Sequence, residues 1–408
     1  MVKTFAKVAL SAAVASLSVT AFGQALEEVV VTAQKRTESL QDVPISVTAI
    51  SGELIQDASI RSFGELGAYV PNFSVSENAV NTIITMRGIS IGGNQSFEQS
   101  VGIFLDGVYL GRSRQARLGL FDLEQVEVLR GPQGILFGKN TLGGAINVRS
   151  AAPVVGEGLS GRVAASFESD NGEYFEGHIS GSVSENVAMR LAVMDRSIDG
   201  YLDNVDLAAA YPNSPTTDET IARIGLQWEP SESTSVGLRY TYSDYRRVGQ
   251  TAVVTDFGPT LVDSTGDGIR NQPFVPSSNA LMYGIMGLRY PTYAPTTSSR
   301  DVFYDGLSIG GTGSLDGGNG PERLSGTDTE NHEFSLNIEH EFGNGMTLTS
   351  VTGASQYEYK DGIEADFLPV EFIGRSDDSE FDQFSQEIRL ASDLDGRFSW
   401  VVGGNFLN

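Results

Sequence analysis

Residues Val126–Val148, VEVLRGPQGILFGKNTLGGAINV, decide the fold of the first part of this chain. Their alternation over Val126–Arg130 predicts a strand, and the glycines that follow indicate tight turns between short strands. The dipeptide Gly138-Lys139 invites a comparison with the phosphate-binding loop. That loop requires glycine where the chain has Gln133 and serine or threonine where it has Asn140, so we exclude nucleotide binding.

The residues before this stretch extend it to a small α+β domain over residues 40–150. Pro44–Ile50 predicts a strand, and Ser62 with Glu65 predicts a capping box that starts a helix ending before Pro71. Val101–Leu110 consists of two short apolar runs around Asp106-Gly107, which is a strong hairpin signal. Residues 122–125 predict a turn that leads into the strand at Val126.

An export signal precedes the domain. Lys3 and Lys7 are followed by an uncharged run, Val8–Phe22, and then by small residues up to Ala25. The apolar run has about 15 residues, fewer than the roughly 20 that a membrane-spanning helix needs. We therefore predict a cleaved signal peptide over residues 1–25, with a buried N-terminal helix as the alternative.

An extended segment follows the signal. Leu26–Arg36 contains three successive valines and a threonine, which favour extended backbone, with acidic residues before them and basic residues after them. A short β-prone segment near a terminus suits strand addition to the sheet of a partner. An ordinary first strand explains the same residues, and the pattern alone does not separate the two.

Composition disfavours several classes of protein. The 408 residues include no cysteine, which excludes disulfides, thiolate metal sites and cysteine nucleophiles. The net charge of −25 disfavours a nucleic-acid partner, because phosphate binding requires clustered lysine and arginine. The three histidines, His178, His332 and His340, are scattered along the chain. We therefore expect no metal site, no cofactor and no enzyme activity.

From about residue 159 the pattern changes to long two-residue alternation. In one example, Val187, Met189, Leu191 and Val193 share a face opposite Arg190 and Ala192. We count about nine strands over residues 151–408. Tight turns at 184–186, 229–233, 342–345 and 392–396 alternate with connections at 170–172, 199–217, 248–327 and 361–380, most of them long. This alternation of short turns and long loops is typical of bacterial membrane barrels.

Five elements, in this order, resemble the TonB-dependent outer-membrane receptors of Gram-negative bacteria. They are the signal peptide, residues 28–33, Met86-Arg87-Gly88, residues 101–112 and residues 121–148. The resemblance implies a plug domain over residues 40–150 and an antiparallel transmembrane β-barrel whose N-terminal portion is residues 151–408. The family barrel has 22 strands. We therefore expect the chain, which stops in mid-strand at residues 400–408, to be a fragment of a longer product.

The same resemblance implies the site residues. Residues 26–39 would form the TonB box and a linker, and the box would comprise Glu28, Val29, Val30, Val31, Thr32 and Ala33. The box is expected to be mobile, unburied and strand-forming, so that the periplasmic protein TonB pairs with it. The plug motif would comprise Arg87, Gly88, Asp106, Gly107, Arg130, Gly131, Pro132, Gly138, Gly143 and Gly144. We expect Arg87 and Arg130 to hold the plug in place by facing carboxylates of the barrel wall.

The long connections carry the weakest signals. The run of Asp263, Thr265 and Asp267 lacks a glutamate at the position of Phe274, which disfavours a calcium loop. Tyr283, Tyr290 and Tyr293 lie in the long connection 248–327 and are candidates for stacking on a flat ligand. Packing within the loop is the simpler explanation of these tyrosines.

The resemblance implies an outer-membrane transporter that takes up a scarce ligand with energy delivered through TonB. A ferric siderophore is the expected ligand; oligosaccharide, haem and cobalamin are alternatives, and neither His332 nor His340 favours haem. The expected partners are TonB, an extracellular iron chelate, outer-membrane lipid and lipopolysaccharide, without nucleic acid. Among other classes, a passive porin leaves residues 40–150 without a role, and a surface adhesin leaves residues 28–33 without one.

Overall fold

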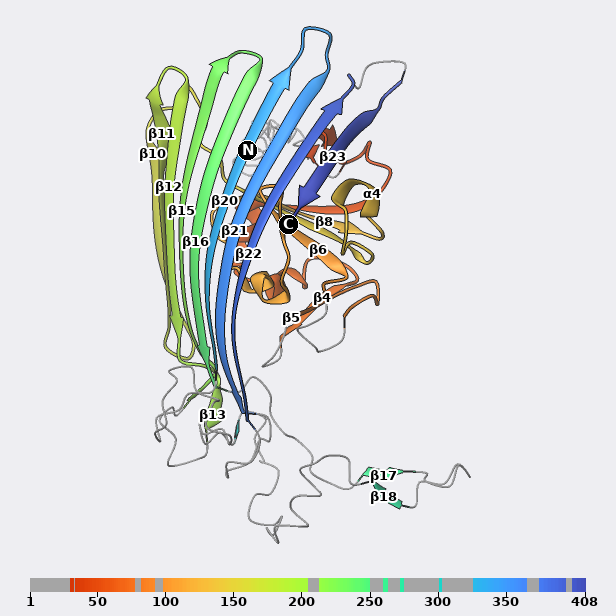
Figure 1. Ribbon diagram of the computed structural model, residues 1–408. Helices are drawn as coiled ribbons and strands as arrows, with labels where there is room; N and C mark the ends of the chain where they lie inside the picture. Colours follow the sequence, from red (N-terminus) through yellow and green to blue (C-terminus); the bar gives the residue numbers. More distant parts are fainter. Residues whose placement is uncertain are drawn as a thin grey trace, which may run out of the picture.

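The computed structural model consists of two parts that lie side by side (Figure 1). One is a sheet of nine long strands, which we call the wall, and the other is a smaller domain, the plug, which packs against one face of it. The described residues are 30–32, 34–77, 82–91, 98–204, 213–249, 260–262, 272–274, 301–302, 326–364, 374–393 and 398–408. The expected signal peptide, residues 1–25, lies outside them.

The plug is built on a five-stranded sheet with the order β3-β8-β9-β6-β7. The strands are β3 (Ser46–Ser51), β6 (Val101–Leu105), β7 (Val108–Leu110), β8 (Leu123–Arg130) and β9 (Gly144–Ser150). All neighbours are antiparallel except β6 and β9, which are parallel. The predicted turn at 122–125 is wrong, because a bulge opposite β9 lets β8 begin at Leu123.

Short helices and a hairpin flank this sheet. They are α2 (Gly52–Asp57), α3 (Phe63–Leu66), the 3-10 helix η1 (Ser113–Arg117), α4 (Gly134–Phe137), and the strands β4 (Phe73–Glu77) and β5 (Thr82–Met86). Ser62 caps α3 as predicted, since its hydroxyl accepts from the N–H of Glu65 at 3.3 Å. The second half of the capping box is wrong: the Glu65 carboxylate accepts from the N–H of Arg61.

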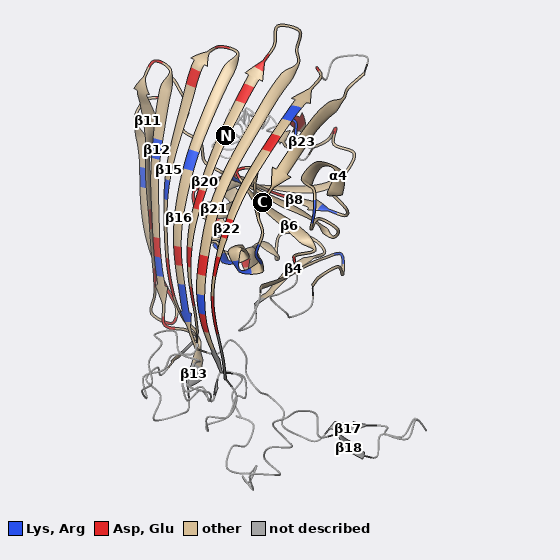
Figure 2. Ribbon diagram, viewed as in Figure 1, with Lys and Arg blue, Asp and Glu red and all other residues tan. Residues whose placement is uncertain are grey.

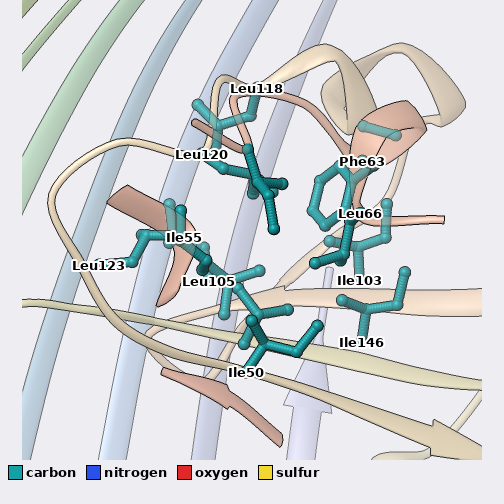
Figure 3. Packing of buried hydrophobic residues seen from close by; sticks show 14 of the residues in the cluster. Ile50, Ile55, Phe63, Leu66, Ile103, Leu105, Leu118, Leu120, Leu123 and Ile146 are labelled. Carbon is teal, nitrogen blue, oxygen red and sulfur yellow. The ribbon is translucent and has the colours of Figure 1, made fainter. Parts of the chain in front are cut away.

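The plug has an apolar core between its sheet and its helices. Figure 3 shows Phe63 and Leu66 of α3 close to Ile103 and Ile146 of the sheet. None of these four side chains is more than 2% exposed. Burying such a side chain contributes about 1.5–3 kcal/mol, so this packing is a main source of the plug's stability. The cluster reaches the wall through Tyr174, Ala192, Met194 and Ile221.

Each long strand of the wall pairs antiparallel with the next one along the chain. The strands are β10 (Ser160–Glu168), β11 (Gly172–Ser184), β12 (Val187–Ile198), β15 (Thr216–Ser231), β16 (Thr234–Val248), β20 (Gly326–Glu341), β21 (Thr347–Glu364), β22 (Gly374–Ala391) and β23 (Val401–Leu407). The predicted architecture, a small α+β domain followed by about nine antiparallel strands, is confirmed.

The two ends of the wall differ in their connections. We call the end where β11 meets β12, β15 meets β16 and β20 meets β21 the turn end, and the opposite end the loop end. Two connections are shorter than predicted, because strand pairing continues into polar sequence: Ser231 pairs with Thr234, and Glu364 pairs with Gly374. Short turns of bacterial barrels lie on the periplasmic side.

Further short strands lie in the connections of the loop end. They are β13 (Leu202–Asn204), β14 (Asn213–Ser214), β17 (Thr260–Val262), β18 (Gln272–Phe274) and β19 (Asp301–Val302). The candidate ligand residues Tyr283, Tyr290 and Tyr293 lie outside the described residues, as do Asp263, Thr265 and Asp267. Their predicted roles therefore stay predictions.

The two faces of the wall differ as the alternation predicted. Arg190 and Arg223 point to the plug, where they bind Asp122 or its backbone. Leu191 and Val193 lie on the other face and are 48% and 41% exposed. An apolar outer face is typical of strands that contact lipid. In the described part of the chain, no helix has the length and apolar character needed to cross a membrane.

Candidate functional site: the plug and its contacts with the wall

The N-terminal segment lies at the edge of the plug. Val30 and Val31 form β1 (Val30–Val31), which pairs antiparallel with β2 (Glu38–Ser39). Val30 is 39% exposed, whereas Val31 is fully buried. Glu28, Val29 and Ala33 of the predicted TonB box lie outside the described residues. The two described valines therefore have the extended backbone that strand addition requires.

Thr32 attaches this segment to the plug sheet. Its backbone N–H donates to Glu127 Oε1 at 2.7 Å, and its hydroxyl donates to the same oxygen at 3.0 Å. Asn147 Nδ2 donates to the Thr32 hydroxyl at 3.1 Å and to Glu127 Oε2 at 3.2 Å. The expectation of an unburied segment is thus wrong for Val31, which is fully buried, whereas Thr32 is half-buried and has its polar partners on β8 and β9.

Lys35 connects the linker to the wall. Its Nζ lies 3.1 Å from Glu387 Oε2 on β22, and it faces the rings of Phe104 and Phe137 at 5.5 and 4.7 Å. Burial lowers the pKa of the Lys35 ammonium, and the neighbouring Glu387 carboxylate only partly opposes that shift. The linker therefore bridges the plug and the wall at the turn end.

Asp122 of the plug binds the wall through its carboxylate and its backbone. Its carboxylate, 1% exposed, accepts from Arg190 Nε at 3.0 Å and also from the terminal nitrogen of that arginine. Arg223 Nη1 donates to the backbone oxygens of Phe121 and Asp122, both at 2.9 Å. Two wall arginines therefore bind the start of β8. Arg190 donates from two nitrogens of its planar guanidinium, a fork that suits a carboxylate.

Two plug arginines bind the wall nearer its loop end. Arg61 pairs with Glu168 of β10, donates to Ser166 at 2.8 Å and stacks on Tyr174 at 3.7 Å. Arg114 of η1 pairs with the buried Asp361 of β21. Figure 2 shows charged residues along the wall strands as well as on the plug. The interface is thus rich in charge pairs.

The predicted plug-motif arginines lie elsewhere. Arg130 Nη1 donates to the backbone oxygen of Pro71 at 3.3 Å, inside the plug. Arg87 is exposed and has a left-handed φ of 50°, with its guanidinium close to Gly131. Both arginines sit in turns of the plug itself, and the expectation that they face wall carboxylates stays a prediction. Their neighbours Gly88, Gly131 and Pro132 belong to the same turns.

The other motif residues form turns that contact the wall or the sheet. Asp106 and Gly107 have φ values of 50° and 86°, as a two-residue hairpin turn requires. The Asp106 backbone oxygen accepts from Asn337 of β20 at 3.3 Å. Gly138 follows α4 directly, Gly143 precedes β9, and Gly144 is the first residue of β9. At Gly144 a Cβ would lie 2.3 Å from the backbone oxygen of Leu129, so no side chain fits.

Sequence reasoning missed four of the residues that hold the plug. Lys35, Asp122, Arg114 and Glu127 were not singled out, although three of them lie within or beside the quoted motifs. Glu127 could have been identified from the sequence, because it is a charged residue inside an apolar run, between Val126 and Val128. The described residues contain no group of three or more His, Asp or Glu arranged to hold a metal.

Comparison with known proteins agrees with this arrangement. Residues 39–145 match the family TonB-dependent Receptor Plug Domain. The pesticin receptor of Yersinia pestis is 26% identical over 206 residues, which cover 50% of this chain and 30% of the receptor. The vitamin B12 transporter BtuB of Vibrio vulnificus is 26% identical over 239 residues, which cover 54% of this chain and 38% of the transporter.

A solved structure extends the likeness to the wall. The ferric yersiniabactin uptake receptor FyuA from Yersinia pestis superposes with a TM-score of 0.66 at 19% identity, covering 89% of this chain and 48% of that chain. The chain therefore spans about half of the solved receptor and a smaller share of the two relatives. A plug seated on antiparallel strands defines a plugged outer-membrane barrel.

The resemblance to the TonB-dependent receptors found in the sequence is thus confirmed: the plug matches their plug-domain family, and plug and wall together share the fold of a solved receptor. This is a family of receptors and transporters of the outer membrane, which confirms the expected location.

Proposed function

We propose that this chain is the plug and adjoining wall of a transporter that takes up a scarce ligand across the outer membrane, driven by TonB. It acts as a transporter and performs no catalysis. One observation carries the proposal: an extended N-terminal segment, Val30–Val31, is bonded through Thr32 to a plug that rests on the wall through polar contacts. A passive porin has no use for such a connection.

Energy enters at the N-terminal segment in this proposal. TonB pairs with residues 28–33 by strand addition and pulls on them. Thr32 transmits the pull to Glu127 and Asn147, which lie on β8 and on the central strand β9 of the plug sheet. The ligand thus crosses when this pull displaces part of the plug.

A ferric siderophore is the ligand that we favour. The relatives support this choice through FyuA, a ferric yersiniabactin uptake receptor, whereas BtuB is a vitamin B12 transporter. Cobalamin, haem and oligosaccharide therefore stay alternatives, to be separated by direct uptake measurements with each compound. Outer-membrane lipid and lipopolysaccharide surround the apolar outer face of the wall in this proposal.

Val30→Pro tests the TonB connection. Proline removes the N–H that strand addition needs, so energised uptake is lost while ligand still binds at the cell surface. Uptake of radioiron-labelled hydroxamate and catecholate chelates, with binding measured in parallel in de-energised cells, provides the readout. Val30→Thr keeps both the N–H and β-branching and retains uptake.

Ser39→Pro is the matched control for the local structure. Ser39 pairs with Val30 in the β1–β2 hairpin but lies outside the predicted TonB box. This variant disturbs the same hairpin and leaves residues 28–33 intact, so uptake persists. If Val30→Pro transports at the rate of the unmodified receptor, the assignment of the TonB box is wrong.

A further inference from the structure

A polar cavity lies between the plug and the wall at the turn end. Its volume is about 720 Å³, and its lining comes from the linker, from β9 and from strands β15 to β22. Gly345 and Asp393, which belong to connections of the turn end, border it on one side. Pockets that bind small molecules have volumes of about 300–1,000 Å³, so this cavity is large enough for one.

The Asp106-Gly107 turn closes the cavity toward the loop end. The turn rests on β20 and β21, because Asn337 donates to the Asp106 backbone oxygen at 3.3 Å and Gly107 lies against Val351. The Asp106 carboxylate is itself held by Ser150, whose N–H and hydroxyl donate to it at 2.9 and 2.7 Å. A plug hairpin therefore separates the cavity from the rest of the plug–wall interface.

The lining is polar and carries both signs of charge. Arg149, Arg239 and Arg389 contribute guanidinium groups, and Glu124, Glu339 and Glu341 contribute carboxylates. Such a surface stays hydrated and has no strong preference for one sign of charge. A polar, hydrated solute matches it better than an apolar one.

One plug strand joins the TonB-box segment to the closing turn. β9 carries Asn147, which bonds Thr32, and Ser150, which holds Asp106. Thr32 itself lines the cavity. A displacement of Thr32 thus reaches the Asp106-Gly107 turn through a single strand, without unfolding the apolar core of the plug.

We infer that this cavity is an inner compartment for the transported ligand, a polar metal chelate of small-molecule size, on the periplasmic side of the Asp106-Gly107 turn. The inference rests on the proposed uptake function. The ligand enters the compartment when the turn leaves β20 and β21, and it departs along the wall face of β16, β20 and β21. The plug core stays in place during this passage.

A cysteine placed in the cavity tests the inference, since the chain has no cysteine of its own. Ser235 lines the cavity from β16, and Val236 is its neighbour on the opposite face of the same strand. Ser235→Cys and Val236→Cys are each treated with N-benzylmaleimide in cells that express the receptor. Mass spectrometry measures the extent of modification, so both variants are compared at known occupancy.

The benzyl adduct on Ser235→Cys abolishes uptake of the radioiron-labelled chelates and leaves their binding at the cell surface unchanged. The adduct on Val236→Cys changes neither. Full modification of Ser235→Cys with normal uptake overturns the inner compartment. Failure of the proposed function is distinguishable, because the unmodified receptor then shows no TonB-dependent uptake at all.

A disulfide cross-link between plug and wall tests whether the plug core stays in place. A Cβ on Gly119, in the plug between η1 and β8, would lie 3.1 Å from the Ile221 side chain of β15, so Gly119→Cys with Ile221→Cys joins plug core and wall by a disulfide away from the Asp106-Gly107 turn. We expect uptake to persist when this bond is formed. Loss of uptake that dithiothreitol restores shows that the plug core must leave the wall, and it overturns the proposed route.

Discussion

The interior of the plug and its interface with the wall are held by different forces. The interior is an apolar cluster that includes Ile50, Phe63 and Leu66, and each of these three side chains is at most 3% exposed. The interface depends on charge pairs, among them Asp122 with Arg190 and Arg61 with Glu168, with a smaller apolar contribution around Ile221. Apolar burial inside the plug is lost only when the plug unfolds, whereas the polar contacts with the wall are replaced by water when the plug moves.

This difference indicates how a plug is able to be both stable and displaceable. A buried ion pair contributes little net stability, because desolvation of the two charges offsets their attraction. Separating the plug from the wall therefore costs less than separating α3 from its sheet. The N-terminal segment follows the same rule, since Thr32 is held by hydrogen bonds and not by apolar packing alone.

Gly144→Ala gives the largest expected effect on the interior. The φ of 156° and the backbone oxygen of Leu129, 2.3 Å from the added Cβ, leave no relaxed position for a methyl group. We expect a loss of about 4 kcal/mol or more in the free energy of unfolding of the plug. Hydrogen exchange of the β8 and β9 amides measures it. Gly134→Ala, where no atom lies within 4 Å, serves as control and has no such effect.

Leu66→Ala probes the core by removing apolar contacts. Leu66 is fully buried, so the truncation leaves a cavity and costs about 3–4 kcal/mol. Leu54 of α2, which is 44% exposed, gives the matched Leu54→Ala control with an effect below about 1 kcal/mol. Equal protection of β8 and β9 amides in both variants would contradict a core that determines plug stability.

Asp122→Ala probes the interface. It leaves the Arg190 guanidinium against the plug without its carboxylate, which costs about 3 kcal/mol in the free energy of plug docking. Asp122→Leu combined with Arg190→Met replaces the pair by apolar side chains and restores docking to within about 1 kcal/mol. Protease protection of the plug in detergent micelles reports docking. A double variant as damaged as the single one would show that the pair itself stabilises the interface.

Lys35→Met gives the smallest effect and carries a pH dependence. Burial lowers the pKa of Lys35 below its ordinary 10.5. At pH values between this lowered pKa and 10.5, the docked linker therefore binds fewer protons than the released linker. Docking of the linker therefore strengthens as the pH rises through this window. Lys35→Met keeps the stem between Phe104 and Phe137, changes docking by less than about 1 kcal/mol and abolishes this dependence.

A spin label on Thr37→Cys follows the linker in both backgrounds, since the chain has no other thiol. The mobile fraction of the label falls with rising pH in the receptor that has Lys35 and stays constant in Lys35→Met. A mobile fraction with the same pH dependence in both backgrounds would assign the titration to another group.

Much of the fold could be predicted because its signals are local. Alternation identified the wall strands and their faces, and Asp106-Gly107 identified the β6–β7 hairpin. The ends of strands were less predictable, because the ladder at Glu364 and Gly374 continues into polar residues that carry no apolar period. Helix α2 was missed since its six residues are too few to show a helical period.

The sequence by itself determined the class of protein, the alternating faces of the wall and the glycine turns, since each depends on neighbours a few residues apart. Only the tertiary structure decided which charges meet. Arg190 lies 68 residues from Asp122, and Lys35 lies 352 residues from Glu387. No periodicity or motif links such positions, because they come together only where the plug rests on the wall. The same contact forms the polar cavity beneath the Asp106-Gly107 turn.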